Sequence, residues 1–133
     1  MSPRHHAASA NTVPVMAGGH YDSGMTAEPR LPAGEVLPLH SLITPTDQGI
    51  ASRILAKAAG GNLTLFAFDA GQGLTEHTSP FDAVVLVTEG ALAITLDGVT
   101  LEAAPGTIVR LPANVPHALE AAAPARMLLV MLK

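Results

Sequence analysis

Apolar and polar residues alternate in short runs from about residue 35 to the end of the chain. The run at residues 61–71, GNLTLFAFDAG, has the two-residue period of a β-strand. Its two faces would carry Leu63, Leu65 and Ala67 on one side and Thr64, Phe66 and Phe68 on the other. Residues 91–98 likewise place Leu92, Ile94 and Leu96 on one side. The pattern predicts strands that each bury at least one face.

The remaining runs extend this prediction over the whole region. Residues 49–58 fit a strand or a short helix, and no run predicts a helix of ten residues. Asp97-Gly98 and Pro105-Gly106 are turn signals. Further strands are predicted within residues 35–43, 82–90, 99–106, 107–122 and 125–133. Many short strands with regular turns predict an all-β fold, and a jelly-roll barrel deals with the edge strands of so small a domain.

Residues 1–34 lack a sustained period. Four prolines and two glycine clusters interrupt them, so we predict a flexible N-terminal arm, followed by one β-barrel domain over residues 35–133. Met16 and Met25 each offer an alternative start. His5, His6 and His20 in this arm are interpreted as solvated side chains rather than a metal-binding tail.

Composition narrows the function classes. The chain has a formal net charge of −4 and 14% charged residues, which argues against a nucleic-acid binder. Cysteine is absent, so thiolate metal ligands and cysteine nucleophiles are excluded, and a cytoplasmic location is expected. No apolar run reaches the length of a membrane span. A small-molecule partner is the remaining expectation.

Two histidines carry the candidate chemistry. His77 and His117 lie on different predicted strands, and they can meet only if the sheet curls, as it does in a barrel. Neutral imidazole is the commonest ligand for divalent metals and also a good general base, so their convergence would make a candidate site. Ser79 shares the face of His77 in an extended strand and could orient a ligand.

The residues around both histidines resemble two motifs of the cupin superfamily, the RmlC-like jelly rolls. Gly71 and His77 match the first motif, with Ser79 at its second histidine and Ala83 at its glutamate. In the second motif Gly106, Pro112 and His117 match, Asn114 replaces a glycine, and Ala121 replaces an asparagine. The resemblance covers residues 35–133 and is closest to small bacterial single-domain cupins with a degenerate metal motif.

The resemblance implies a pocket at the barrel mouth, with His77 and His117 left from four typical metal ligands. A divalent metal, Fe, Mn, Ni or Zn, would then have an incomplete ligand set, because catalytic zinc normally keeps three protein ligands. His40 and Gln72 are candidates for the third position, and Gln72 is also a candidate ligand-binding residue.

Several other polar side chains are assigned to the surface. Glu76, Asp82, Arg110 and Glu120 should face outward by the alternation of their strands. Ala83, Leu119 and Ala121 should face inward and make the pocket largely apolar. Met127 and Met131 in the last strand are expected in the core or the pocket wall.

Three functions stay open at this stage. The first is a site that binds a small molecule around His77 and His117, with a divalent metal as cofactor or with none. The second is a metal-free isomerase or epimerase-like enzyme with one of these histidines as its catalytic general base. The third is a non-catalytic binding module. By resemblance we also expect a homodimer, formed when residues 35–43 add as a strand to a partner's sheet.

Overall fold

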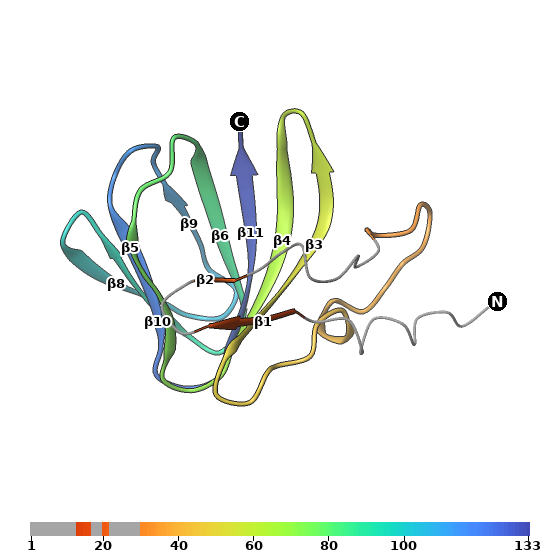
Figure 1. The fold of residues 1–133 in the computed structure, drawn as a ribbon, viewed down its shortest axis with the longest axis horizontal. Helices are drawn as coiled ribbons and strands as arrows, with labels where there is room; N and C mark the ends of the chain where they lie inside the picture. Colours follow the sequence, from red (N-terminus) through yellow and green to blue (C-terminus); the bar gives the residue numbers. More distant parts are fainter. Residues whose placement is uncertain (1–12, 17–19, 22–29) are drawn as a thin grey trace.

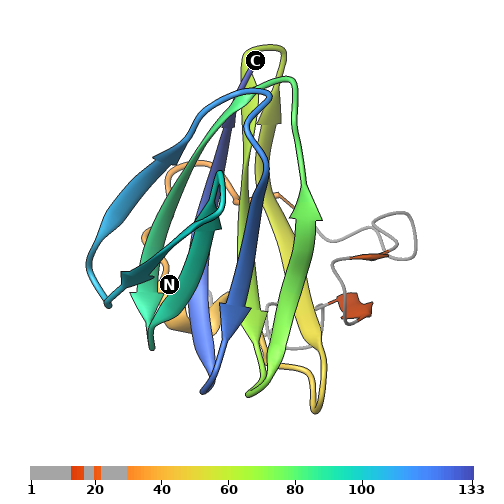
Figure 2. The same cartoon turned by 90° about the vertical axis from the view of Figure 1, so that its left-hand side faces the viewer.

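The computed structural model describes residues 13–16, 20–21 and 30–133. Almost all of its regular structure is β, in two antiparallel sheets that face each other as a jelly roll (Figure 1, Figure 2). The large sheet has the order β2-β1-β3-β4-β11-β6-β9 and the small sheet the order β5-β10-β7-β8. The all-β jelly-roll prediction is therefore confirmed.

From residue 50 onward, the strands follow the predicted runs. The strands of the large sheet are β1 (Val13–Met16), β2 (His20–Tyr21), β3 (Ile50–Ala58), β4 (Gly61–Phe68), β6 (Asp82–Glu89), β9 (Ile108–Leu111) and β11 (Ala125–Leu132). Those of the small sheet are β5 (Gln72–His77), β7 (Leu92–Leu96), β8 (Val99–Ala103) and β10 (His117–Ala121). Residues 49–58 thus form a strand rather than a helix. Within the described ranges, no helix is long and apolar enough to cross a membrane.

The main core lies between the inner faces of the two sheets. Strands β3 to β11 contribute residues to it, and Phe68, Val85, Leu92, Ile94 and Met127 are among its fully buried side chains. The predicted inward residues of the second half of the chain, Ala83, Leu119 and Ala121, also belong to this cluster.

A second apolar cluster covers part of the outer face of the large sheet. Leu65 and Ala67 of β4 lie in it, with Leu63 packed against it, whereas Phe66 and Phe68 lie in the main core. Both predicted faces of β4 are therefore correct, and both are buried. The cover comes from the segment before β3, chiefly from Leu42 and Ile43.

That covering segment corrects one prediction. Residues 35–43 do not form a strand; they include only a 3₁₀ turn, η2 (Leu39–Ser41). Pro38 has no N–H for a ladder, and its carbonyl accepts hydrogen bonds from the N–H and hydroxyl of Ser41. Arginine side chains bond three further carbonyls of the segment. Arg53 donates to Leu42 O, and Arg126 donates to the carbonyls of His40 and Ile43.

The segment packs on its own sheet instead of standing free as a strand, and the predicted homodimer stays a prediction.

The tight turns adopt the backbone conformations that the sequence indicated. Asp97 and Gly98 have φ values of 50° and 83°, and Gly106 has a φ of 82°. Asn114, at the position where the resembling motif has glycine, has a φ of 65°. Asparagine tolerates this left-handed region better than most residues, so the substitution keeps the turn before β10.

The N-terminal range contains two short strands. β1 pairs with β3 and β2 pairs with β1, so part of residues 1–34 extends the large sheet at its β3 edge (Figure 1). His5, His6 and Met25 lie outside the described residues. The flexibility of the arm and the domain boundary at residue 35 stay predictions.

Candidate functional site: a histidine pair at the barrel mouth

A bulge in β5 brings His77 onto the inner side of the sheet. Leu119 of β10 pairs with Leu74 of β5, and His117 pairs with His77. Between these two pairs the chain advances by two residues in β10 but by three residues in β5. The extra residue lies in β5 and reverses the alternation, so His77 follows the inward-facing Leu74 on the same side. The two histidines thus become direct cross-strand neighbours. His77 and His117 therefore converge, as the sequence predicted.

The two imidazole rings touch edge to face. Their centroids are 4.5 Å apart and their planes make an angle of 71°. Nδ1 of His77 lies 2.7 Å from the carbonyl oxygen of Thr75, and Nδ1 of His117 lies 3.2 Å from that of Val115. Because a carbonyl can only accept, Nδ1 carries the proton in both rings. In this tautomer, an unprotonated ring keeps the Nε2 lone pair for another partner.

The two rings differ in burial. His117 has 5% of its surface exposed, whereas His77 is exposed at the rim. Burial lowers the pKa of His117, and a positive charge on the neighbouring His77 lowers it further, while the hydrogen bond to Val115 acts in the opposite direction. His117 is therefore neutral at pH 7 and available as a hydrogen-bond or proton acceptor.

Backbone hydrogen bonds hold the rim loops around the pair. The N–H of Asn114 donates to Ser79 O at 2.7 Å, and the N–H of Asp97 donates to Pro116 O at 2.9 Å. These bonds join the loop before β10 to the loop after β5 and to the β7–β8 turn. The backbone on the N-terminal side of His117 is therefore held by hydrogen bonds, which limits movement of the ring.

Ser79 has a local role in this rim. Its Oγ accepts a hydrogen bond from the N–H of Phe81 at 3.1 Å, and its carbonyl holds Asn114. This arrangement stabilises the turn between β5 and β6. The structure therefore assigns its hydroxyl a turn-forming bond, and a ligand contact by Ser79 stays a prediction.

Gln72 and His40 lie away from the pair. Gln72 begins β5 and His77 ends it, which separates them by roughly 16 Å along the strand. Oε1 of Gln72 is buried without a hydrogen-bond partner at that far end. His40 is tied through its carbonyl to Arg126, near the start of β11, which is also the far end. Neither residue supplies a third ligand at the histidine pair.

The charged residues assigned to the surface are there. Asp82 and Arg110 form an exposed ion pair at 3.3 Å on neighbouring strands. Asp82 also accepts a hydrogen bond from the N–H of Ala113 at 2.8 Å, so it anchors the loop that leads to His117. Glu76 and Glu120 are exposed as predicted.

The donor set at the pair does not fit a metal centre of the usual three or four protein ligands. Across the described ranges, no group of three or more His, Cys, Asp or Glu is arranged to hold a metal ion. Ala83, where the resembling motif has a glutamate, is 2% exposed and faces inward beside Met131. Methyl and thioether groups replace the expected carboxylate at this position.

Sequence reasoning missed the two carbonyls that orient the rings and the bulge that turns His77 inward. Each carbonyl belongs to the residue two positions before its histidine. Any residue type can supply a carbonyl, so the sequence carries no signal for this contact. Leu96, the cross-strand neighbour of His117 on β7, was predicted only as an apolar residue of its face.

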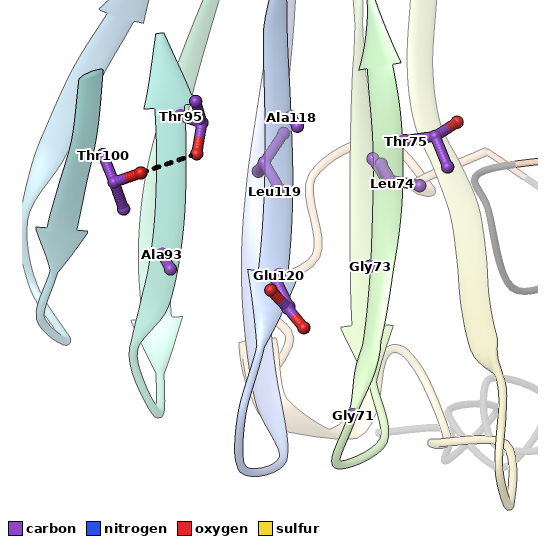
Figure 3. A pocket seen from close by; sticks show the side chains of 10 residues that line it. All are labelled: Gly71, Gly73, Leu74, Thr75, Ala93, Thr95, Thr100, Ala118, Leu119 and Glu120. Atoms are coloured by element: carbon purple, nitrogen blue, oxygen red, sulfur yellow. Dashed lines mark hydrogen bonds between the residues drawn. The ribbon is translucent and has the colours of Figure 1, made fainter. Parts of the chain in front are cut away.

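A hollow of about 380 Å³ lies elsewhere, across the outer face of the small sheet (Figure 3). The hollow is deep where small residues line it, at Gly73, Ala93 and Ala118. At its side, the hydroxyls of Thr95 and Thr100 share a hydrogen bond of 2.9 Å. Its lining is Gly71, Gly73, Leu74, Thr75, Ala93, Thr95, Thr100, Ala118, Leu119 and Glu120. Neither histidine of the pair contributes to it.

Comparison with known proteins agrees with this geometry. The family model described as a cupin domain matches residues 64–131, just over half of the chain. This chain belongs to the cupin family. The cupin match spans the strands that hold both histidines, from β4 to β11. No curated protein matches the chain.

Solved structures similar to this cupin support the same assignment. A conserved protein of unknown function from Streptococcus pyogenes is 33% identical, with a TM-score of 0.74, over 84% of this chain and 97% of that one. A cupin superfamily protein from Desulfitobacterium hafniense is 28% identical, with a TM-score of 0.73, over 80% and 98%. A Thermus thermophilus protein is 26% identical, with a TM-score of 0.67, over 74% and 96%.

Proposed function

We propose that this cupin binds a small molecule at the barrel mouth through His77 and His117. The observation that carries the proposal is the ring arrangement: both Nδ1 atoms are committed to backbone carbonyls, and both Nε2 atoms are left for a ligand. Two adjacent acceptors fixed by the backbone favour a ligand that offers hydrogen-bond donors.

The surroundings of the pair favour a mainly apolar, hydroxylated ligand. Leu96 and Met131 are partly exposed apolar residues packed against the core, and both lie at the mouth end of their strands, as His117 does. A neutral phenol or enol would place its ring or chain against these residues and donate its O–H to an imidazole. A carboxylate would be repelled by the Nε2 lone pairs of the two rings, unless one ring first took up a proton.

His117 supports acid–base chemistry on such a ligand. Its lowered pKa keeps the ring neutral at pH 7, so Nε2 can accept a proton from an acidic O–H or C–H of the bound molecule. The resulting imidazolium would lie against the ring of His77. In this proposal the imidazoles contact the ligand directly. The alternative is that they bind a divalent metal, and the experiment must distinguish the two cases.

The test uses phenol and catechol as probes, with anisole and benzoate as matched compounds that lack a donor. We expect the phenols to shift the imidazole NMR signals of His77 and His117, in chelator as well as without it. His77→Gln and His117→Gln should each weaken binding about tenfold, the loss of one hydrogen bond worth about 1.4 kcal/mol. His40→Gln, which changes an exposed histidine at the other end, is the control.

Two results would contradict the proposal. Binding that is abolished by chelator and restored by Fe(II), Mn(II), Ni(II) or Zn(II) would assign the pair to a metal centre. Equal binding of phenol by wild type and both histidine variants would place the ligand elsewhere. Turnover of a bound compound, lost in His117→Gln, would extend the proposal from binding to catalysis.

A further inference from the structure

One cross-strand row on the inner face of the small sheet joins the histidine pair to the edge strand β8. His117 pairs with His77 on one side and with Leu96 of β7 on the other. Leu96 in turn pairs with Val99 of β8, which ends the small sheet (Figure 1). Directly paired residues carry their side chains on the same face of a sheet. The row therefore has two imidazoles at one end and two aliphatic side chains at the other.

The inner face of β8 becomes more exposed toward the mouth of the barrel. Ala103, Leu101 and Val99 follow one another along this face, and their exposed fractions are 9%, 43% and 60%. On β7, Leu92 and Ile94, the partners of Ala103 and Leu101, are fully buried. The core thus fills the base of the barrel, while the inner face of β8 near the mouth is open to solvent although its side chains are apolar.

Leu96, Val99 and Leu101, here called the apolar strip, continue the candidate site away from the imidazoles. All inner-face residues of β7, β8 and β9 are apolar, so these strands place no charge beside the strip. Val109 of β9, the edge strand of the large sheet, also faces inward and packs against the core. Exposed apolar surface beside a polar site is typical of a ligand-binding surface. Because the strip is continuous with the histidine pair, one ligand can contact both.

The register sets the length of a ligand that uses both parts. Val99 is two strand spacings from His117, which is roughly 10 Å. A phenol that donates its O–H to an imidazole would place its ring against Leu96, which is one spacing away, and would end before Val99. An alkyl chain at the para position continues in the same direction and would lie against Val99 and Leu101.

We propose that the ligand class is amphiphilic: a phenol or enol at the histidine pair, with an alkyl chain that lies along the apolar strip. This inference rests on the proposed function, because the pair fixes the polar end of the ligand. It adds a specificity-determining surface, which selects the ligand by the length and polarity of its chain. Val99 and Leu101 are the residues that distinguish an alkylphenol from phenol itself.

A comparison of phenol with 4-propylphenol tests the strip in the wild-type protein. Complete burial of one methylene lowers Kd about fourfold, and burial on a half-open surface about twofold. With three additional carbons, 4-propylphenol should therefore bind at least about eightfold more tightly than phenol, as measured by titration of the imidazole NMR signals. The polar compound 4-(hydroxymethyl)phenol should bind no more tightly than phenol. His117→Gln should weaken phenol and 4-propylphenol by the same factor.

Val99→Asn tests the far end of the strip with a neutral polar side chain. Because Val99 is mostly exposed, the variant should fold with the wild-type thermal midpoint. Its Kd for phenol should stay within about twofold of wild type, whereas the advantage of 4-propylphenol should fall to about threefold or less. Val36→Asn is the matched control, because it makes the same change at a fully exposed valine outside the strip, and it should keep the whole advantage.

A second measurement needs no variant. In wild type, nuclear Overhauser effects should connect the propyl protons of bound 4-propylphenol to the methyl groups of Val99 and Leu101. Contacts of the chain with other residues only, or an advantage of the chain that Val99→Asn leaves unchanged, would overturn the strip and leave phenol binding at the pair in place. Phenols that do not move the imidazole signals at all would overturn the proposed function and this inference together.

Discussion

At the scale of single residues, one extra residue in β5 determines what His77 can do. Without the bulge, the alternation that buries Leu74 would turn His77 away from His117. The carbonyls of Thr75 and Val115 then select the same tautomer in both rings. The chemistry of the pair therefore depends on backbone geometry as much as on the imidazoles.

The lowered pKa of His117 predicts a pH-dependent stability. The folded pKa lies below the unfolded value of about 6.5, so the unfolded chain binds more protons between these two values. The contribution is fully present above about pH 6.5 and is lost as the pH falls through the folded pKa. Chemical denaturation from about pH 7.5 to about pH 5 should show a smaller loss of unfolding free energy for His117→Gln than for wild type.

His77→Gln provides the control for the cause of that shift. Burial is the larger cause and the charge of His77 the smaller one, so His77→Gln should reduce the pH dependence without removing it. The same pH profile in wild type and in His117→Gln would show that His117 is not responsible.

At the scale of elements, the segment before β3 shows where alternation misleads. Residues 35–43 read as an apolar strand, yet they cross the outer face of the large sheet as an irregular segment. Pro38 prevents regular pairing, and two arginines from β3 and β11 bond the carbonyls instead. Both arginines are distant from the segment in sequence, so these hydrogen bonds cannot be predicted from the local sequence pattern.

Leu42→Ala should therefore destabilise the protein. Leu42 is 3% exposed in the second apolar cluster, and its truncation should cost about 2–5 kcal/mol of unfolding free energy. Leu39→Ala is the matched control in the same segment, and it should cost clearly less than Leu42→Ala because Leu39 is 40% exposed. Urea titration gives both values, and equal losses would show that the segment does not cover the sheet.

At the scale of the whole molecule, both apolar clusters share the same strands. β3 and β4 contribute their inner residues to the main core and their outer residues to the second cluster. Since a strand cannot leave one cluster without disturbing the other, the two should melt together.

Calorimetry can test this coupling. We expect one thermal transition with equal calorimetric and van't Hoff enthalpies. Val85→Ala in the main core and Leu42→Ala in the second cluster should each lower the midpoint of that single transition. Two resolved transitions, each moved by only one of these variants, would mean that the clusters unfold independently.

The candidate site was predicted in part. The histidine pair followed from the motif spacing, as did the inward Ala83 and the left-handed Asn114. Gln72 and His40 were candidates for a third ligand beside the pair, but both lie at the other end of the barrel. Ligand contacts, a metal, the cytoplasmic location and the homodimer stay predictions.

From residue 50 onward, the sequence by itself determined most strands, their faces and the turns, because alternation and turn chemistry act between residues close in the chain. The tertiary structure decided the rest: the bulge that pairs His77 with His117, the carbonyls that orient both rings, and the cover over β3 and β4. Each of these depends on register or on groups distant in sequence. Local patterns carry no information about such contacts until the chain has folded.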